Sequence, residues 1–204
     1  MKICAIVGAA DFYSERFESD KYELIIAADG GFSSLSKIGV TPDVLVGDMD
    51  SLEGLPSGIE ICRFKVEKDE TDMMLALLEG VKRGFDTFYI FGGVGGRIDH
   101  TFANYCLLKY AKDRGVSAYL MDKDYYAFVI KNEKIELQGS VGKTFSIFAF
   151  GAAATGVTVR GAKYEVENAT LTPEFAIGVS NSFVGGAAEI SVADGSLLVM
   201  AEYK

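Results

Sequence analysis

The sequence has little of several residue types, and each shortage argues against a class of protein. It contains no tryptophan, one histidine, three prolines and three cysteines among 204 residues. The cysteines, Cys4, Cys62 and Cys106, are odd in number and lack C-x-x-C spacing. This argues against a disulfide framework and a cysteine-based zinc site, and we expect buried free thiols in a reducing compartment. No Ser-His-Asp order is evident.

Basic residues are also scarce. The chain has 20 Lys and Arg against 29 Asp and Glu, a net charge of −9. We expect no nucleic-acid partner, because phosphate backbones demand basic patches. A small anionic ligand is compatible with this charge where a metal ion or a local Lys or Arg offsets it. The first apolar run, Ile3–Val7, reaches Gly8 too soon for a signal peptide or membrane span, so we expect a cytoplasmic protein without a membrane partner.

The first half of the chain alternates apolar runs with segments of helical spacing. This alternation predicts an α/β domain, a mostly parallel sheet with helices on both faces. Expected strands are 3–7, 22–28, 44–46, 59–66, 87–91 and 116–121. Expected helices are 32–38, about 71–83, and a segment after His100 that runs to about Arg114. In the second helix we expect Asp69 as the N-cap and an apolar stripe of Met74, Leu77, Leu78 and Val81; in the third we expect Phe102, Cys106, Leu107 and Tyr110 to share one face.

The pattern changes after Asp124. Short apolar segments without helical periodicity follow one another, separated by Gly, Asn, Asp or Pro. This pattern predicts a small antiparallel β-sandwich or barrel. We therefore expect two domains, 1–123 and 124–204. The strand candidates are 125–130, 134–137, 144–150, 156–159, 162–166, 176–179, 187–192 and 196–202.

Polar clusters follow the expected strands of the first domain. They are Asp29-Gly30-Gly31, Asp48-Met49-Asp50, Lys68 to Asp72, and Gly92 to Asp99. The carboxyl ends of parallel strands lie along one edge of a sheet, where ligands bind. We therefore expect segments that are distant in sequence to converge at one rim.

The residue types in these clusters suit a phosphate ligand. Carboxylates such as those of Asp48, Asp50, Asp72 and Asp99 are hard oxygen ligands for Mg²⁺, which leaves room for substrate phosphates. The glycines allow close backbone approach with N–H groups aimed at phosphate oxygens. Arg97 offers a fork for phosphate, and Lys68 adds a point charge. The sequence therefore predicts a metal-dependent phosphate or nucleotide site at the sheet edge.

Each feature also has a structural explanation. The pair Asp48 and Asp50 suits a solvent turn, and Gly92–Gly96 could be a turn as well. Asp72 could stabilise a helix N-terminus, and Arg97 could pair with Asp99 or a surface acid. His100 could be structural or a helix-start residue. The G-x-x-x-x-G-K-[ST] loop and the G-x-G-x-x-G fingerprint are both absent from the sequence.

Several motifs together resemble the thiamine pyrophosphokinase family, bacterial type. They occur in the family's order and at its approximate spacing, and they span both expected domains. The matching motifs are Asp29-Gly30-Gly31, Pro42-Asp43-x-x-x-Gly47-Asp48-x-Asp50-Ser51, Lys68-Asp69-x-Thr71-Asp72, Gly92-Gly93-x-x-Gly96-Arg97-x-Asp99-His100 and Ser180-Asn181-x-Phe183. The resemblance implies a homodimer whose N-terminal domain binds ATP and Mg²⁺ and whose β-sandwich binds thiamine. It implies transfer of the intact diphosphate of ATP to the thiamine hydroxyl, giving thiamine diphosphate and AMP.

The resemblance also implies roles for individual residues. Asp48, Asp50, Asp72 and Asp99 would form the catalytic set, the first three as metal ligands. Ser180 and Asn181 would contact thiamine. Ser182 occupies a slot where relatives often have Glu, and no Trp is present to stack on thiamine, so another group must face its ring. The nucleotide-binding set would be Asp29, Gly30, Gly31, Lys68, Thr71, Gly92, Gly93, Arg97 and His100.

Two other functions fit the same residues. One is a diphosphokinase or nucleotide pyrophosphatase for another acceptor, which would release AMP without thiamine. The other is a non-catalytic nucleotide or thiamine diphosphate sensor, which would bind ATP without releasing AMP. The sequence leaves open which residue is the general base and how many metal ions bind.

Overall fold

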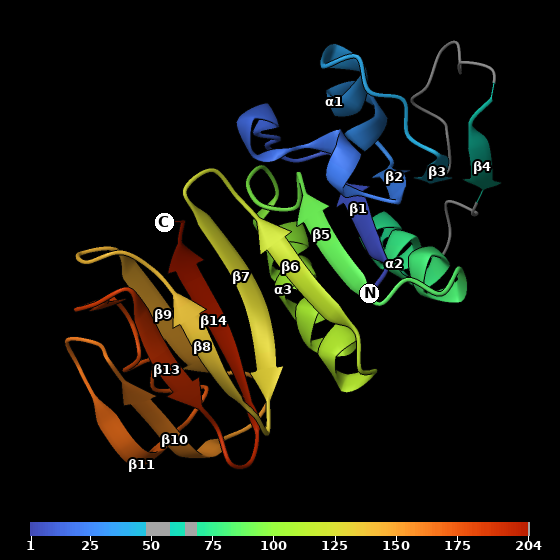
Figure 1. The fold of residues 1–204 in the computed structure, drawn as a ribbon. Coiled ribbons are helices and arrows are strands. Elements are labelled where there is room, and N and C mark those ends of the chain that lie inside the picture. The colour runs from blue at the N-terminus through green and yellow to red at the C-terminus, as the bar shows by residue number, and fades with distance from the viewer. Residues whose placement is uncertain (48–57, 64–68, 204) are drawn as a thin grey trace. The chain divides into compact units, whose positions relative to one another are not determined.

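The computed structural model describes residues 1–47, 58–63 and 69–203 of the chain. They form two compact units (Figure 1). Unit 1 comprises residues 1–107 and 115–123, and unit 2 comprises residues 108–114 and 124–204. Helix α3 (Ile98–Asp113) begins in unit 1 and ends in unit 2. Among the described residues, no helix has both the length and the apolar character needed to span a membrane.

Unit 1 contains the predicted parallel sheet. Its strand order is β6-β5-β1-β2-β3-β4, and each neighbouring pair is parallel. The strands are short, and apart from the edge strand β4 they are mostly apolar, as expected where both faces are covered. Their bounds are β1 Ile3–Val7, β2 Leu24–Ala28, β3 Val44–Gly47, β4 Glu60–Arg63, β5 Thr87–Phe91 and β6 Ser117–Met121.

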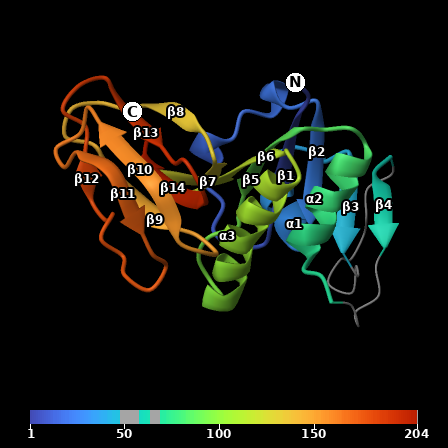
Figure 2. The same ribbon diagram turned by 90° about the horizontal axis from the view of Figure 1, so that it is seen from below.

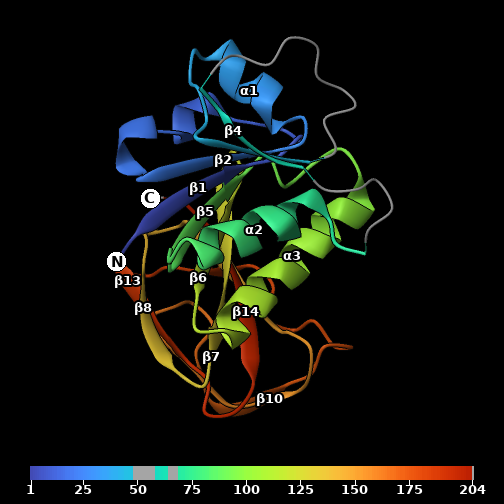
Figure 3. The same cartoon turned by 90° about the vertical axis from the view of Figure 1, so that its right-hand side faces the viewer.

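Helices cover both faces of this sheet. Helix α1 (Gly31–Lys37) lies on one face and α2 (Asp72–Lys82) on the other (Figure 3). Two short 3₁₀ turns, η1 (Ser14–Arg16) and η2 (Ser19–Lys21), connect β1 to β2. Side chains of β1 alternate between the two layers, so Ala5 and Val7 join the cluster around Leu35 of α1.

The start and the buried face of α2 differ from prediction. The N-cap is Thr71 rather than Asp69, because the Thr71 hydroxyl accepts a hydrogen bond from the Met74 N–H at 3.2 Å. The inner face includes Gly80, which packs so closely on Phe88 that a Cβ atom there would collide with the ring. Hydrophobicity alone does not identify a glycine as a core residue. The buried face of α2 is therefore rotated about the helix axis relative to the predicted stripe. The buried residues are Met73, Leu75, Ala76, Leu77 and Gly80, while Met74, Leu78 and Val81 are only half-buried.

Two further predictions are corrected in α3 and the cysteines. Phe102 and Cys106 are exposed, and the buried residues of α3 are Asn104, Leu107, Leu108 and Ala111. The polar Asn104 takes a core position, which an apolar stripe cannot reveal. All three cysteines are free, but only Cys4 is buried; Cys62 is half-buried.

Unit 2 is an antiparallel β-sandwich (Figure 2). One sheet has the order β12-β9-β14-β7 and the other β11-β10-β13-β8. Apolar residues from both sheets form one core around Phe145, Phe183 and Ile190. The strands are β7 Tyr125–Lys131, β8 Lys134–Gln138, β9 Thr144–Ala149, β10 Ala154–Arg160, β11 Val166–Leu171, β12 Asn181–Ser182, β13 Ala187–Ser191 and β14 Ser196–Glu202.

Two predicted strands of unit 2 are wrong. Residues 162–166 form a loop, with only an isolated bridge between Ala162 and Phe183, and the strand lies further on, in the mostly exposed segment 166–171. Residues 176–179 are not a strand either. There the Gly178 carbonyl accepts a hydrogen bond from the Ile147 N–H at 2.9 Å, without a continuous ladder.

Candidate active site

A cavity of about 410 Å³ lies at the carboxyl ends of the strands of unit 1. From the neighbouring strands β1 and β5, the chain continues in opposite directions across the sheet, to β2 and to β6. Such a switch point leaves a crevice where ligands bind in open α/β sheets. The cavity is lined by Gly8, Ala9, Ala10, Ala28, Asp29, Thr71, Asp72, Met73, Gly92, Gly93, Gly95, Gly96, Arg97, His100 and Asn104.

The loops after β1 and β5 are joined by backbone hydrogen bonds. The Gly8 N–H donates to the Phe91 carbonyl at 2.8 Å, and the Ala10 N–H donates to the Gly92 carbonyl at 2.9 Å. Gly92, Gly95 and Gly96 have φ angles of 58°, 93° and 61°, in the left-handed region that favours glycine. These three glycines are therefore needed for the backbone conformation of the loop, in addition to letting a ligand approach it closely.

The N-terminus of α2 forms another wall. Thr71 caps the helix and Asp72 is its first residue, and both line the cavity. The first N–H groups of a helix and its dipole attract anions, including phosphates. A carboxylate beside them can hold a cation between itself and a bound phosphate. This end of α2 therefore has the elements that a metal–phosphate complex requires.

Arg97 and Asp99 form a two-point ion pair at the edge of the cavity. Arg97 Nη2 lies 2.6 Å from Asp99 Oδ2, and Arg97 Nε lies 3.2 Å from Oδ1. The His100 N–H also donates to Asp99 Oδ1 at 2.9 Å. Donation by Arg97, reinforced by the His100 N–H, holds the pKa of Asp99 at about 2, below its ordinary value. Of the two residues only Arg97 lines the cavity, so its guanidinium is placed to exchange Asp99 for a phosphate.

The segment Asp29-Gly30-Gly31 has a structural role at the start of α1. Asp29, which lines the cavity, has a left-handed φ of 49°, and its N–H donates to the Val46 carbonyl at 2.8 Å. Gly31 is the first residue of α1, and a Cβ atom there would overlap the Val7 carbonyl. Gly30 and Gly31 are not among the residues that line the cavity. The tight packing of α1 on β1 accounts for Gly31 without a ligand.

The structure brings together part of the predicted site. Asp48, Asp50 and Lys68 lie outside the described residues. Ser180 and Asn181 belong to unit 2. The predicted residues that line one cavity are Asp29, Thr71, Asp72, Gly92, Gly93, Arg97 and His100.

The oxygen donors of the cavity fit a hard cation. The acidic residues Asp29 and Asp72 line it, and Mg²⁺ uses only one or two protein carboxylates beside substrate phosphates. Within residues 1–47, 58–63 and 69–203, another cluster has metal-ligand spacing: Glu60, Cys62 and Glu79 on β4 and α2. Arg83 already neutralises that cluster, because it bonds Glu60 at 3.0 Å and Glu79 at 2.8 Å.

In unit 2, the side chain of Asn181 is engaged with backbone groups. Its Nδ2 donates to the Tyr164 carbonyl at 2.7 Å, and its Oδ1 accepts from the N–H groups of Tyr164 and Ser182 at 3.0 and 2.9 Å. Asn181 is 9% exposed. Ser180 has a left-handed φ of 58°, and its N–H donates to Ser146 Oγ at 3.0 Å. Asn181 therefore fixes the loop that carries Tyr164, whose side chain is exposed.

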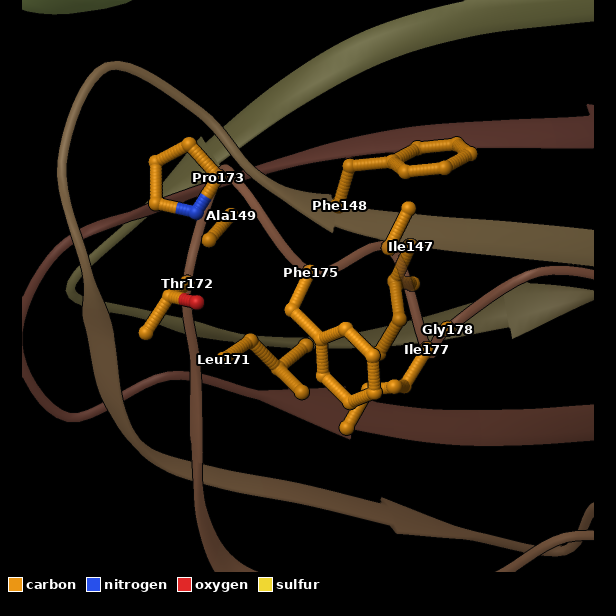
Figure 4. Close-up of a pocket in the computed structure, with 10 residues that line it drawn as sticks. Ile147, Phe148, Ala149, Leu171, Thr172, Pro173, Phe175, Ile177 and Gly178 are labelled. Carbon is orange, nitrogen blue, oxygen red and sulfur yellow. The ribbon is translucent and has the colours of Figure 1, made fainter.

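The segment before Ser180 borders a small cavity against β9 (Figure 4). Residues 171–173 and 175–178 line it together with Ile147, Phe148 and Ala149. Its volume is about 10 Å³, while pockets for small molecules typically measure roughly 300–1,000 Å³. This cavity is therefore a packing defect and not a substrate site.

Sequence reasoning missed Asn104 and the loop Gly8–Ala10 as parts of the site. Asn104 is 5% exposed, and its Nδ2 donates to the Gly93 carbonyl at 2.8 Å. Asn104 lies outside the apolar face expected for this helix, so the expected stripe gave no signal for it. The loop Gly8–Ala10 follows a strand in the same way as the clusters that were selected, but it carries no charged residue.

Two family models and a curated relative match most of this chain. Residues 17–120 match the family model of the thiamin pyrophosphokinase catalytic domain, and residues 130–197 match that of the thiamin pyrophosphokinase vitamin B1 binding domain. A thiamine pyrophosphokinase of Bacillus subtilis is 27% identical over 191 residues, which cover 89% of this chain and 88% of that protein.

Solved structures show the same fold. A crystal structure of thiamine pyrophosphokinase from Bacillus subtilis superposes with a TM-score of 0.89 over 100% of both chains, at 23% identity. The thiamin pyrophosphokinase of Candida albicans gives 0.83 over 100% of this chain and 89% of that chain, at 16% identity. Because the two domain models match most of the sequence in order, the chain belongs to the thiamine pyrophosphokinase family.

Proposed function

We propose that this protein is a thiamine pyrophosphokinase, which transfers the intact diphosphate of ATP to the hydroxyl group of thiamine. The products are thiamine diphosphate and AMP. The observation that carries the proposal is the cavity at the β1–β5 switch point, where a helix N-terminus, a glycine loop, carboxylates and Arg97 meet. Its volume of about 410 Å³ lies within the range of small-molecule sites. The match to both domain models of the family supports our assignment of one reaction to this cavity.

In this proposal, ATP binds with its phosphates between the glycine loop and the N-terminus of α2. Arg97 leaves Asp99 and forms its two-point contact with phosphate oxygens. Asp72, with Asp48 and Asp50 from outside the described residues, would hold Mg²⁺. The ion supplies charge neutralisation for the phosphates when it is bound.

The chemical step is a displacement at the β-phosphorus. The thiamine hydroxyl oxygen forms a bond to this phosphorus, and the bond from the phosphorus to the oxygen that bridges it to the α-phosphorus breaks. That bridging oxygen leaves with AMP, and a carboxylate takes the hydroxyl proton. Arg97 stabilises negative charge that redistributes over the phosphate oxygens. In this proposal Asp48, Asp50, Asp72 and Asp99 would all serve the phosphate site, and such a set of acids suits turnover better than simple binding.

Thiamine would bind through unit 2, which contains Ser180 and Asn181. Thiamine is a cation, so the net charge of −9 favours its approach. We further propose a homodimer, supported by exposed apolar side chains on unit 2 at Phe175, Ile177 and Val184. Three free cysteines support a cytoplasmic, reducing environment.

A product assay tests the proposal. Purified protein is incubated with ATP, Mg²⁺ and thiamine, and the nucleotides are separated by chromatography. We expect AMP and thiamine diphosphate in equal amounts, and neither product when thiamine is omitted or the metal is chelated. AMP without thiamine would identify a pyrophosphatase instead, and ATP binding without AMP would identify a sensor.

A further inference from the structure

The glycine loop Gly92–Gly96 is held through its carbonyl groups. Each of the carbonyl oxygens of residues 92–95 accepts a hydrogen bond from outside the loop. The oxygens of Gly92 and Val94 accept from the backbone N–H groups of Ala10 and Asp11, at 2.9 and 3.3 Å. These two bonds tie one side of the loop to the segment after β1.

Helix α3 holds the other two carbonyl groups. The Gly93 oxygen accepts from Asn104 Nδ2 at 2.8 Å, and the Gly95 oxygen accepts from the Thr101 hydroxyl at 3.3 Å. Thr101 and Asn104 are three residues apart and so share one face of the helix. The Thr101 hydroxyl also lies 3.2 Å from the Arg97 carbonyl, so its single proton is shared and Asn104 is the stronger anchor.

Holding the carbonyl groups determines where the N–H groups point. A peptide unit is planar and trans, so its C=O and the N–H of the following residue point in opposite directions. A carbonyl oxygen turned into the cavity would repel phosphate oxygens, whereas an N–H would attract them. The bonds from Asn104 and Thr101 keep two carbonyl oxygens directed at α3. Gly93, Gly95 and Gly96 line the cavity beside them.

The contact between Asn104 and the loop is closely packed. Asn104 is 5% exposed and also lines the cavity. A Cβ atom on Gly93 would lie 3.2 Å from Asn104 Nδ2 and 2.8 Å from Leu120 Cδ1. Glycine at this position therefore lets the loop come within reach of the amide.

We propose that Asn104 is a positioning residue for ATP: it holds the Gly93 carbonyl oxygen against α3, so that this oxygen does not face the nucleotide phosphates, and it fixes the loop whose residues Gly93, Gly95 and Gly96 line the cavity. This inference rests on the proposed function, since the phosphates of ATP are the ligand. Thr101 has the same role to a smaller extent.

Two variants test the inference. Asn104→Leu removes the donor without adding charge, and Asn104→Asp replaces the donor with a carboxylate oxygen. For both variants we expect ATP binding at least tenfold weaker by calorimetry with Mg·ATP, a raised KM for ATP, and a KM for thiamine within twofold of wild type. Weaker binding in Asn104→Asp alone would reflect charge on the cavity wall and would overturn the inference.

Asn181→Leu is the matched control for ATP binding. Asn181 is also a buried asparagine whose Nδ2 donates to a carbonyl, but in unit 2. We expect its ATP dissociation constant to stay within twofold of wild type. An equal loss in the control would show that general destabilisation explains the Asn104 result, and would overturn the inference.

A second site keeps the test decisive if the Asn104 variants do not fold. Thr101→Val affects a half-buried side chain and should weaken ATP binding about threefold with an unchanged KM for thiamine. Wild-type ATP affinity in folded Thr101→Val would then overturn the inference. A wild-type protein that fails to bind ATP or to form AMP contradicts the proposed function itself. An active wild type with unchanged ATP affinity in folded Asn104 variants contradicts only this inference.

Discussion

Gly8 and Gly92 lie so close together that neither has room for a side chain. A Cβ atom on Gly8 would lie 2.6 Å from the Gly92 carbonyl oxygen, and a Cβ atom on Gly92 would overlap the Gly8 carbonyl oxygen. These two residues continue the β1–β5 pairing past the ends of the strands and line the cavity. We predict that Gly8→Ala lowers the free energy of unfolding by about 1–3 kcal/mol, as overpacked substitutions do. Urea denaturation measures this change, and calorimetry should show weaker ATP binding.

Gly186→Ala is the matched control for that substitution. Neither Gly186 nor Gly8 has a left-handed φ, but beyond Gly186 and its two chain neighbours no atom lies within 4 Å of a Cβ placed on Gly186. We expect its unfolding free energy to change by less than about 0.5 kcal/mol, as for most surface substitutions. Equal effects at the two positions would show that close packing at Gly8 is not the cause.

Asp72→Asn tests the carboxylate at the start of α2. We predict that kcat falls at least 100-fold while the fold persists, because Asp72 lines the cavity and is outside the buried core. Loss of a negative charge at a helix N-terminus costs only about 0.3–1 kcal/mol of stability. Steady-state kinetics and thermal denaturation measure the two effects. The control is Asp20→Asn in the exposed turn η2, which should change neither kcat nor thermal stability. A wild-type kcat in Asp72→Asn would show that Asp72 does not belong to the catalytic set.

The Arg97–Asp99 pair predicts an unusual titration. The pKa of Asp99 is held at about 2 because the carboxylate accepts hydrogen bonds from Arg97 and from the His100 N–H. A lowered pKa means that the stabilisation from the pair is present above the ordinary value, roughly 3.9, and is lost as pH falls through about 2. In Arg97→Gln we expect the Asp99 pKa to rise toward its ordinary value. A carbon-detected NMR titration of the Asp99 carboxyl group measures it.

The control for this titration is a distant ion pair. Lys21 and Glu18 pair at 2.6 Å on the surface near η2. Lys21→Gln should leave the Asp99 titration unchanged. If Asp99 still titrates near pH 2 in Arg97→Gln, a group other than the guanidinium lowers its pKa.

Ser180 and Asn181 should affect thiamine far more than ATP. Asn181 fixes the Tyr164 backbone, so we predict that Asn181→Ala raises the KM for thiamine at least tenfold through the position of that loop. Ser180→Ala should act in the same direction. The KM values for both substrates, measured with the other substrate saturating, test this. An equal rise in the KM for ATP would show that Ser180 and Asn181 do not act specifically on thiamine binding.

The sequence predicted the parallel sheet well because its strands are apolar on both faces. The predicted run 3–7 became β1 with the same bounds, and the polar clusters after β2 and β5 do reach one cavity. The parallel direction of the strands explains this success, since it fixes which strand ends share an edge. The family motifs added the reaction, which physical reasoning could not have reached from strand ends alone.

Errors arose where packing rather than polarity decides structure. The buried face of α2 depends on Gly80 fitting against Phe88, which hydrophobicity does not register. The exposed segment 166–171 pairs through its backbone and has no apolar alternation to mark it as a strand. Asn104 was missed because its role is a single hydrogen bond to the Gly93 carbonyl, between elements whose contact only the fold creates.

The most direct test follows the β-phosphate of ATP. The protein is incubated with thiamine, Mg²⁺ and ATP that carries radioactive phosphorus at the β-position only, and the products are separated by chromatography. Transfer of the intact diphosphate predicts that the label leaves the nucleotide and appears in thiamine diphosphate, with unlabelled AMP in equal amount. Labelled ADP together with thiamine monophosphate would instead show transfer of a single phosphoryl group and would contradict the account.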